Sequence, residues 1–127
     1  MATRSLGRYD HPNFLVRREA HQKTVAGNGA VKTFRHYQKM RLKALHSIVV
    51  TAGTSDSPGN ALTIKHGTTS IGAVALGTAT AGVTFTNTFN LDVDSLALLS
   101  VTNGTDASGV ADIIWEFEVL PDSALTV

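Results

Sequence analysis

The chain of 127 residues contains no cysteine, so disulfide bonds, thiolate metal sites and a cysteine nucleophile are excluded. It also has no run of about 18 uncharged apolar residues, and no membrane-spanning helix or membrane partner is expected. Its first ten residues lack the apolar run of a secretory signal, so export by the usual route is not expected. After residue 46 cations are nearly absent, since Lys65 is the only lysine or arginine there.

Catalytic and metal-binding patterns are missing as well. Neither the His-Glu-x-x-His zinc motif nor the Gly-x-Ser-x-Gly nucleophile motif occurs, and the glycine-rich loops lack the lysine of a phosphate cradle. Asp92 and Asp94, with Asp106 further on, supply fewer oxygens than the six or more that calcium takes, so roles in turns are favoured. The sequence therefore predicts a protein that is not an enzyme and that holds no cofactor and no metal.

What the chain does have is a strong separation of charge. Ten of its eleven lysine and arginine residues, but only two of its ten acids, lie before position 47, which gives residues 1–46 a net charge of +8. Residues 47–127 hold one cation and eight acids, a net charge of −7. A solvated face normally mixes both signs. The split therefore predicts a basic N-terminal arm and docking segment over residues 1–46 and a β-sandwich body over residues 47–127.

The body has the composition of short strands and tight turns. Beyond residue 50, Gly, Thr, Ser, Ala and Val dominate, and short apolar segments alternate with turn residues. This pattern predicts an all-β fold, either a β-sandwich or a small β-barrel of jelly-roll or tulip-like form. The expected strands cover residues 61–65, 69–76, 82–89 and 96–102, followed by a last strand. In that strand the residues expected to face inward are Ile113, Trp115, Phe117 and Val119, and those expected to face outward are Asp112, Glu116 and Glu118.

Two segments before residue 51 have sequence patterns that predict a strand and a turn. From Phe34 to Val50, a period of 2 predicts a strand, whereas a period of 3.6 gives a helix with a poorer apolar stripe, and the choice for residues 34–45 stays open. The strand is favoured, and its expected inward face is Met40, Leu42, Ala44, His46, Ile48 and Val50. Asn28-Gly29 is a candidate hairpin tip between Val25 and Val31.

A basic segment, Tyr9-Asp10-His11-Pro12-Asn13-Phe14-Leu15-Val16-Arg17-Arg18, precedes a body that contains Thr69-Ser70-Ile71-Gly72-Ala73-Val74-Ala75-Leu76-Gly77-Thr78 and Ala107-Ser108-Gly109-Val110-Ala111. In these features the chain resembles the small head decoration, or cement, proteins of tailed phages. The resemblance implies a β-sandwich or tulip-like module on the outer surface of a virion's capsid, bridging neighbouring subunits of the major capsid protein. It also implies a homo-oligomer, with a trimer favoured over a dimer.

In that role the arm would dock on an acidic capsid surface, because arginine pairs with carboxylates through two hydrogen bonds and apolar side chains bury area at the contact. The candidate docking residues are basic, aromatic or aliphatic and lie within residues 1–46. They are Phe14, Leu15, Arg17, Arg18, Phe34, Tyr37, Lys39, Arg41 and Lys43.

Two other functions fit parts of the sequence. The arm of a small viral coat protein could contact nucleic acid, with aromatic side chains such as Tyr9 and Tyr37 stacking on bases. The absence of a run of three arginines disfavours this partner. Alternatively, the body could be a receptor- or glycan-binding spike module. The single tryptophan, Trp115, is expected in the core, so the exposed aromatic platform of many sugar sites is not evident.

Overall fold

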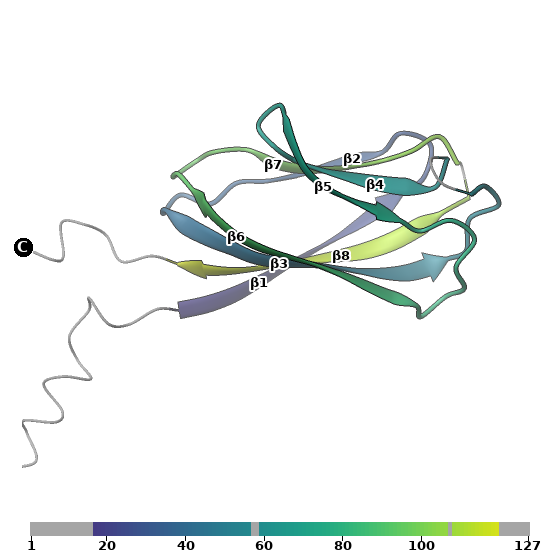
Figure 1. Ribbon diagram of the computed structural model, residues 1–127, viewed down its shortest axis with the longest axis horizontal. Coiled ribbons are helices and arrows are strands. Elements are labelled where there is room, and N and C mark those ends of the chain that lie inside the picture. The colour runs from purple at the N-terminus through teal and green to yellow at the C-terminus, as the bar shows by residue number, and fades with distance from the viewer. Residues whose placement is uncertain (1–16, 57–58, 107, 120–127) are drawn as a thin grey trace, which may run out of the picture.

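The computed structural model describes residues 17–56, 59–106 and 108–119, and they form a sandwich of two four-stranded antiparallel sheets (Figure 1). Sheet A has the strand order β1 (Arg17–Ala26), β8 (Val110–Val119), β3 (Met40–Thr51) and β6 (Thr84–Val93). Sheet B has the order β2 (Val31–Phe34), β7 (Leu99–Asn103), β4 (Ala61–His66) and β5 (Thr69–Ala75). The all-β prediction is confirmed in its sandwich form, since the strands make two separate sheets rather than one closed barrel.

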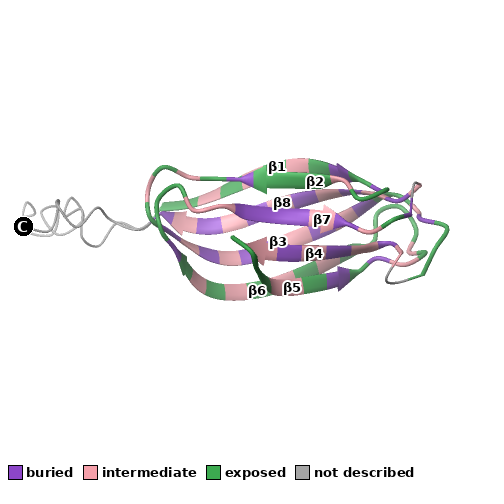
Figure 2. Ribbon diagram, turned by 90° about the horizontal axis from the view of Figure 1, so that it is seen from above, coloured by how far each residue is buried: buried purple, intermediate pink, exposed green. Residues whose placement is uncertain are grey.

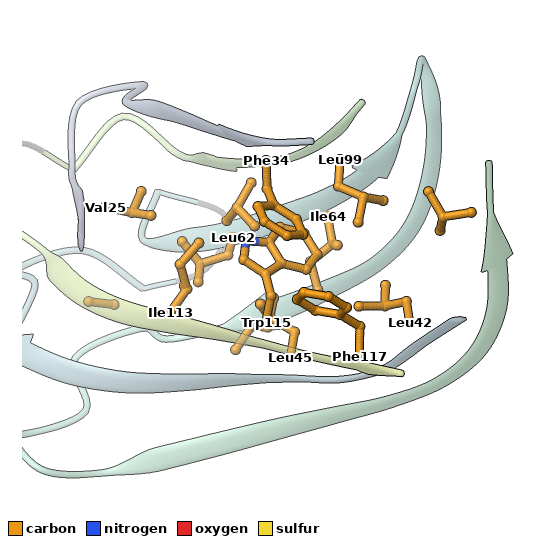
Figure 3. Close-up of a cluster of buried hydrophobic side chains, with 14 of the residues drawn as sticks. Val25, Phe34, Leu42, Leu45, Leu62, Ile64, Leu99, Ile113, Trp115 and Phe117 are labelled. Atoms are coloured by element: carbon orange, nitrogen blue, oxygen red, sulfur yellow. The ribbon is translucent and has the colours of Figure 1, made fainter. Parts of the chain in front are cut away.

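The core lies between the sheets and is centred on aromatic side chains (Figure 3). The ring of Phe34, from β2, lies 5.3 Å from the ring of Phe117 and 6.1 Å from that of Trp115, both on β8. The inward face predicted for β8 is confirmed, because Ile113, Trp115, Phe117 and Val119 are all buried. Aliphatic side chains from both sheets surround the rings: Val25, Leu42, Leu45, Leu62, Ile64 and Leu99.

Of residues 34–45, which the sequence left open between helix and strand, Phe34 ends β2, residues 35–39 form a loop and Met40 begins β3. The inward face of β3 differs from the prediction beyond Ala44. The register with both neighbouring strands shifts between Leu42 and Ala44. Such an irregularity reverses which side chains point inward, because strand side chains alternate with a period of 2. After it Ala44 and Leu45 are both buried, followed by Ser47 and Val49, while His46 and Ile48 lie on the outer face and Val50 is exposed.

The predicted arm over residues 1–46 requires correction for the residues that the structure describes. Residues 17–46 include β1, β2 and the first half of β3, so the predicted boundary falls inside a strand of sheet A. The sequence of β1 shows no alternation of apolar and polar residues. Its inward face carries Glu19, His21 and Lys23, and these polar residues are tolerated because they are only half-buried at the edge of the sandwich. Only Val25 on that face is fully buried. Residues 1–16 lie outside the described residues.

The predicted turn at Asn28-Gly29 is present, but it does not form a hairpin. Both residues have positive φ angles, 63° and 73°. The strands on either side belong to different sheets, since β1 pairs with β8 and β2 pairs with β7 (Figure 1). The turn therefore carries the chain from sheet A to sheet B. The strand pair expected around His66-Gly67 is a true hairpin, formed by β4 and β5.

Gly27 lies where this crossover packs against another loop, and it is expected to tolerate no side chain. A Cβ at this position would overlap the carbonyl oxygen of Asp106. Gly27→Ala is expected to lower the free energy of unfolding by about 2 kcal/mol, measured by urea denaturation, because backbone on both sides must shift. Gly29→Ala is the control: nothing lies within 4 Å of its Cβ, and only its positive φ is strained, at about 1 kcal/mol. Equal losses for the two variants would contradict the predicted clash.

Candidate docking surface

The order of strands in sheet A balances the charge separation seen in the sequence. Strands β1 and β3, from the basic part of the chain, each carry a net charge of +2. Strand β8, from the acidic part, carries −3 and lies between them, and β6 carries −1 at the far edge. The four strands together are neutral. Much of the charge that predicted an external partner is therefore paired within the sheet.

The pairing follows a ladder of charged side chains across the outer face of sheet A. The cross-strand register aligns one residue from each strand, with alternating signs: Arg18, Glu118, Arg41 and Asp92. Arg18 Nη2 donates to Glu118 Oε1 at 3.1 Å, and Arg41 Nε donates to Asp92 Oδ1 at 2.8 Å. This hydrogen bond lowers the pKa of Asp92 and raises that of Arg41. Opposite charges on neighbouring strands stabilise the sheet modestly, because they are exposed.

A second row extends the ladder through His46. Its Nε2 lies 3.0 Å from Glu116 Oε1, and its Nδ1 lies 3.0 Å from Thr86 Oγ1. Arg18 Nη1 also donates to Glu116 Oε2, at 2.6 Å. The hydrogen bond with His46, and then Arg18, lowers the pKa of Glu116. The Thr86-His46-Glu116 connectivity matches that of an acid–base triad. Here, however, the three side chains stand on the open face of a sheet and link strands β6, β3 and β8.

The structure separates the predicted docking residues into distinct groups. Arg18 and Arg41 belong to the ladder, Arg17 pairs with Glu19, and Lys43 donates to Asn90 at 3.2 Å. Phe34 is a correction: its side chain is buried in the core against Trp115 and is not on the surface. Tyr37 and Lys39 lie together in the loop between β2 and β3. Phe14 and Leu15 lie outside the described residues.

The loop that contains Tyr37 lies at the end of the sandwich where both terminal segments attach. Arg17, the first residue of β1, pairs with Val119, the last residue of β8 (Figure 1). Met40, which follows the loop, also pairs with Val119. We call this the terminal end. Two loops form it, residues 35–39 and residues 94–98, and they are joined by the Leu96 N–H, which donates to the His36 carbonyl at 2.7 Å.

Tyr37 is highly exposed yet held in place. Its side chain is 72% exposed, and its ring stacks on that of His36 at 5.1 Å between centroids. His36 is fixed in turn, because its Nδ1 accepts the Gln38 N–H at 3.1 Å and its ring packs edge-on against Phe117. An exposed aromatic ring that loses little freedom on binding is a typical anchor at protein interfaces.

Leu96 is the second exposed apolar residue of the terminal end, and the sequence did not single it out. It is 59% exposed and has a φ of 64°, a conformation that is strained for a leucine. Two hydrogen bonds hold its backbone, one to His36 and one from Arg35 Nη1 to the Leu96 carbonyl at 2.7 Å. The apolar run Leu96-Ala97-Leu98-Leu99 predicted a strand from residue 96, whereas β7 begins at Leu99. Positive φ at a leucine has no sequence signal.

The opposite end of the sandwich is organised by one buried carboxylate, Asp106. Its Oδ2 accepts the N–H groups of Thr54 at 2.7 Å and Ser55 at 2.6 Å, and its Oδ1 accepts the N–H of Ser108 at 2.9 Å and the Ser108 hydroxyl at 2.7 Å. These bonds, led by the Ser108 hydroxyl, hold the pKa of Asp106 far below its usual range. Asp106 therefore closes a loop, as the turn role predicted.

Of the remaining histidines, His21 packs in the sandwich. His21 stacks on Phe34 at 4.6 Å, and its pKa is lowered by burial and by nearby Lys23. Within residues 17–56, 59–106 and 108–119, no group of three or more His, Asp or Glu side chains is placed to hold a metal ion. The same residues include no helix long and apolar enough to cross a membrane.

Comparison with known proteins shows a likeness of fold alone. No family model and no curated protein matches the sequence. A Bacillus endospore appendage protein, from a family of disulfide-linked pili, aligns at 14% identity and a TM-score of 0.48, covering 85% of this chain and 88% of that one. A xylanase CBM36-1 domain from the hindgut metagenome of Trinervitermes trinervoides aligns at 10% identity and 0.47, covering 80% and 96%. Latent PorU from Porphyromonas gingivalis aligns at 13% and 0.50, covering 82% of this chain and 13% of that one. The chain is a small all-β protein whose described residues form a sandwich of two sheets.

Proposed function

We propose that the chain is a non-catalytic structural module that decorates the outer surface of a phage capsid and docks on the major capsid protein through its terminal end. The observation that carries the proposal is the composition of this end. It combines both chain attachments, at Arg17 and Val119, with the two most exposed large apolar side chains of the described residues, Tyr37 and Leu96. A module that binds through one end leaves the rest of the sandwich projecting from the shell.

The charges of the terminal end fit an acidic partner. Arg35 and Lys39 flank Tyr37 in the same loop. Lys39 has no ion-pair partner among the residues that the structure describes, in contrast to Arg18 and Arg41. Lysine and arginine around an aromatic anchor supply long-range attraction and specificity, while the buried anchor supplies affinity. The predicted docking residues Phe14 and Leu15 precede Arg17 in the sequence and stay candidates for the same contact.

The proposed cementing depends on several weak contacts acting together. A copy that binds two neighbouring capsid subunits, or an oligomer that binds more, raises the effective concentration of every further contact. Because the bound form holds subunits together, binding adds to the stability of the shell. The neutral ladder on sheet A gives no support to a nucleic-acid partner, and the burial of Trp115 gives none to a sugar platform.

The sharpest test separates docking from folding at Leu96. Leu96→Gly removes the exposed side chain and also relieves the positive φ, so the free energy of unfolding is expected to stay the same or rise. Binding to capsids that lack the protein, assembled from the major capsid protein of the same genome, is expected to weaken at least tenfold by co-sedimentation, as does binding of Tyr37→Ala.

Val50→Ala is the matched control, because Val50 is 45% exposed but lies at the opposite end of β3. This variant is expected to bind capsids like the wild type. Undiminished binding of both Leu96→Gly and Tyr37→Ala would exclude the terminal end as the docking surface.

A further inference from the structure

The two edges of sheet A differ in how they are protected against pairing with another strand. At one edge, β1 carries the exposed cations Arg17 and Arg18 and the inward-pointing charges Glu19 and Lys23. Cations and inward-pointing charges are devices by which edge strands avoid pairing with other chains. The β1 edge is therefore unsuited to strand addition.

The other edge, β6, has none of these devices. It is ten residues long, contains no proline, lysine or arginine, and its one charge, Asp92, is paired with Arg41 near the strand end. It pairs with β3 on one side, and no strand among the described residues pairs with its other side. Figure 2 shows β6 along the rim of the sandwich, beside β5 of the other sheet. A long edge without cations or inward-pointing charges is a template for strand addition.

Burial along β6 indicates that its inner face is incompletely covered. Phe85, Phe89 and Leu91 point inward and pack against the core, but all three are only partly buried. The inward residues of β8, in the middle of the same sheet, are by contrast fully enclosed. The neighbouring sheet reaches β6 through Asn87, whose Nδ2 donates to the Ala73 carbonyl at 3.2 Å, and through Phe89, which lies near Gly72. A further strand beside β6 would cover more of these apolar side chains.

The sequence of β6 is complementary to itself in an antiparallel arrangement. If the strand meets a second copy with Asn87 opposite Asn87, Phe85 lies opposite Phe89 and Thr86 lies opposite Thr88. Inward residues then meet inward residues, so both sheet faces continue across the junction. Aromatic pairs and threonine pairs are favourable across strands, and no two charges of like sign are opposed. A second copy of β6 therefore matches both faces of the edge at once.

We propose that a second copy of this chain pairs with the outer edge of β6, antiparallel about a twofold axis at Asn87, so that two copies of sheet A form one continuous eight-stranded sheet. The contact is isologous and gives a dimer, the less favoured of the two states that the resemblance implied. It leaves the terminal end free, so it is independent of the proposed docking on a capsid.

The test uses the full chain and sedimentation velocity over a range of protein concentrations. The wild type is expected to form a dimer, and Thr88→Lys is expected to raise the dissociation constant at least tenfold, because it places a cation on the exposed face of the paired edge. Ala20→Lys puts the same charge on the exposed face of β1 and is expected to leave the dimer unchanged. Thermal melting checks that both variants stay folded.

The register is tested by a single cysteine in a chain that has none of its own. Asn87→Cys is expected to form a disulfide-linked dimer under oxidising conditions, because directly opposite residues of antiparallel strands lie within disulfide reach. Thr24→Cys, on β1, is expected to give no disulfide-linked dimer under the same oxidising conditions, as read by non-reducing gel electrophoresis. A monomer at every concentration, or a dimer that neither Thr88→Lys weakens nor Asn87→Cys cross-links, would overturn the proposal.

Discussion

Replacing Asp106 with asparagine is expected to lower the melting temperature of the protein by on the order of 15 °C. The carboxylate accepts two backbone N–H groups on one oxygen and two groups of Ser108 on the other, at 2.6 to 2.9 Å. An amide keeps one acceptor and turns the other into a donor. In either orientation an NH₂ group then faces donors, and buried N–H groups of the loop are left without a partner.

The same carboxylate gives the variant a distinctive dependence on pH. Because the hydrogen bonds hold the folded-state pKa of Asp106 far below its unfolded value of about 3.9, its contribution to stability is present above that value and is lost as the pH falls below it. The difference in unfolding free energy between wild type and Asp106→Asn is therefore expected to shrink between about pH 5 and pH 2. Urea denaturation at several pH values measures it.

Asp112→Asn provides the comparison, since Asp112 accepts one bond from Thr24 on the exposed face of sheet A. This variant is expected to melt within a few degrees of the wild type. A difference between Asp106→Asn and wild type that stays constant from pH 5 to pH 2 would show that the charge of Asp106 does not stabilise the loops.

Trp115→Ala is expected to lower the free energy of unfolding by about 3 to 5 kcal/mol. The side chain is completely buried, and it stands on β8, which pairs with β1 on one side and β3 on the other. Its ring contacts Phe34 of the opposite sheet, so its removal opens a cavity that both sheets line (Figure 3). Because the protein has one tryptophan, unfolding is followed by circular dichroism rather than by its fluorescence.

Trp115→Phe separates packing from hydrogen bonding. The indole Nε1 is buried and has no hydrogen-bond partner among the described residues. Phenylalanine therefore loses volume but leaves no unpaired donor, and its cost is expected to be about 1 to 2 kcal/mol. If Phe and Ala destabilised the protein equally, the volume of the indole could not be the source of the effect.

The candidate docking surface was only partly visible in the sequence. Tyr37 and Lys39 were predicted because they lie in the basic part of the chain, and the structure places both in one loop of the terminal end. Leu96 escaped prediction, because its exposure follows from a positive φ that hydrogen bonds with a distant loop maintain. Arg18 and Arg41 were predicted as docking residues, but each forms an ion pair with a carboxylate that is 100 or 51 residues away along the chain.

The sequence by itself determined the all-β class and the inward face of β8, because both follow from local alternation of apolar and polar residues. It also determined the separation of charge. Only the tertiary structure decided what that separation means: strands from the basic and acidic parts alternate in sheet A, so opposite charges meet side by side. Likewise, the irregularity at Leu42 to Ala44 redirects β3, because pairing with β8 and β6 fixes its register. Strand order and register depend on contacts between distant residues, which no local pattern encodes.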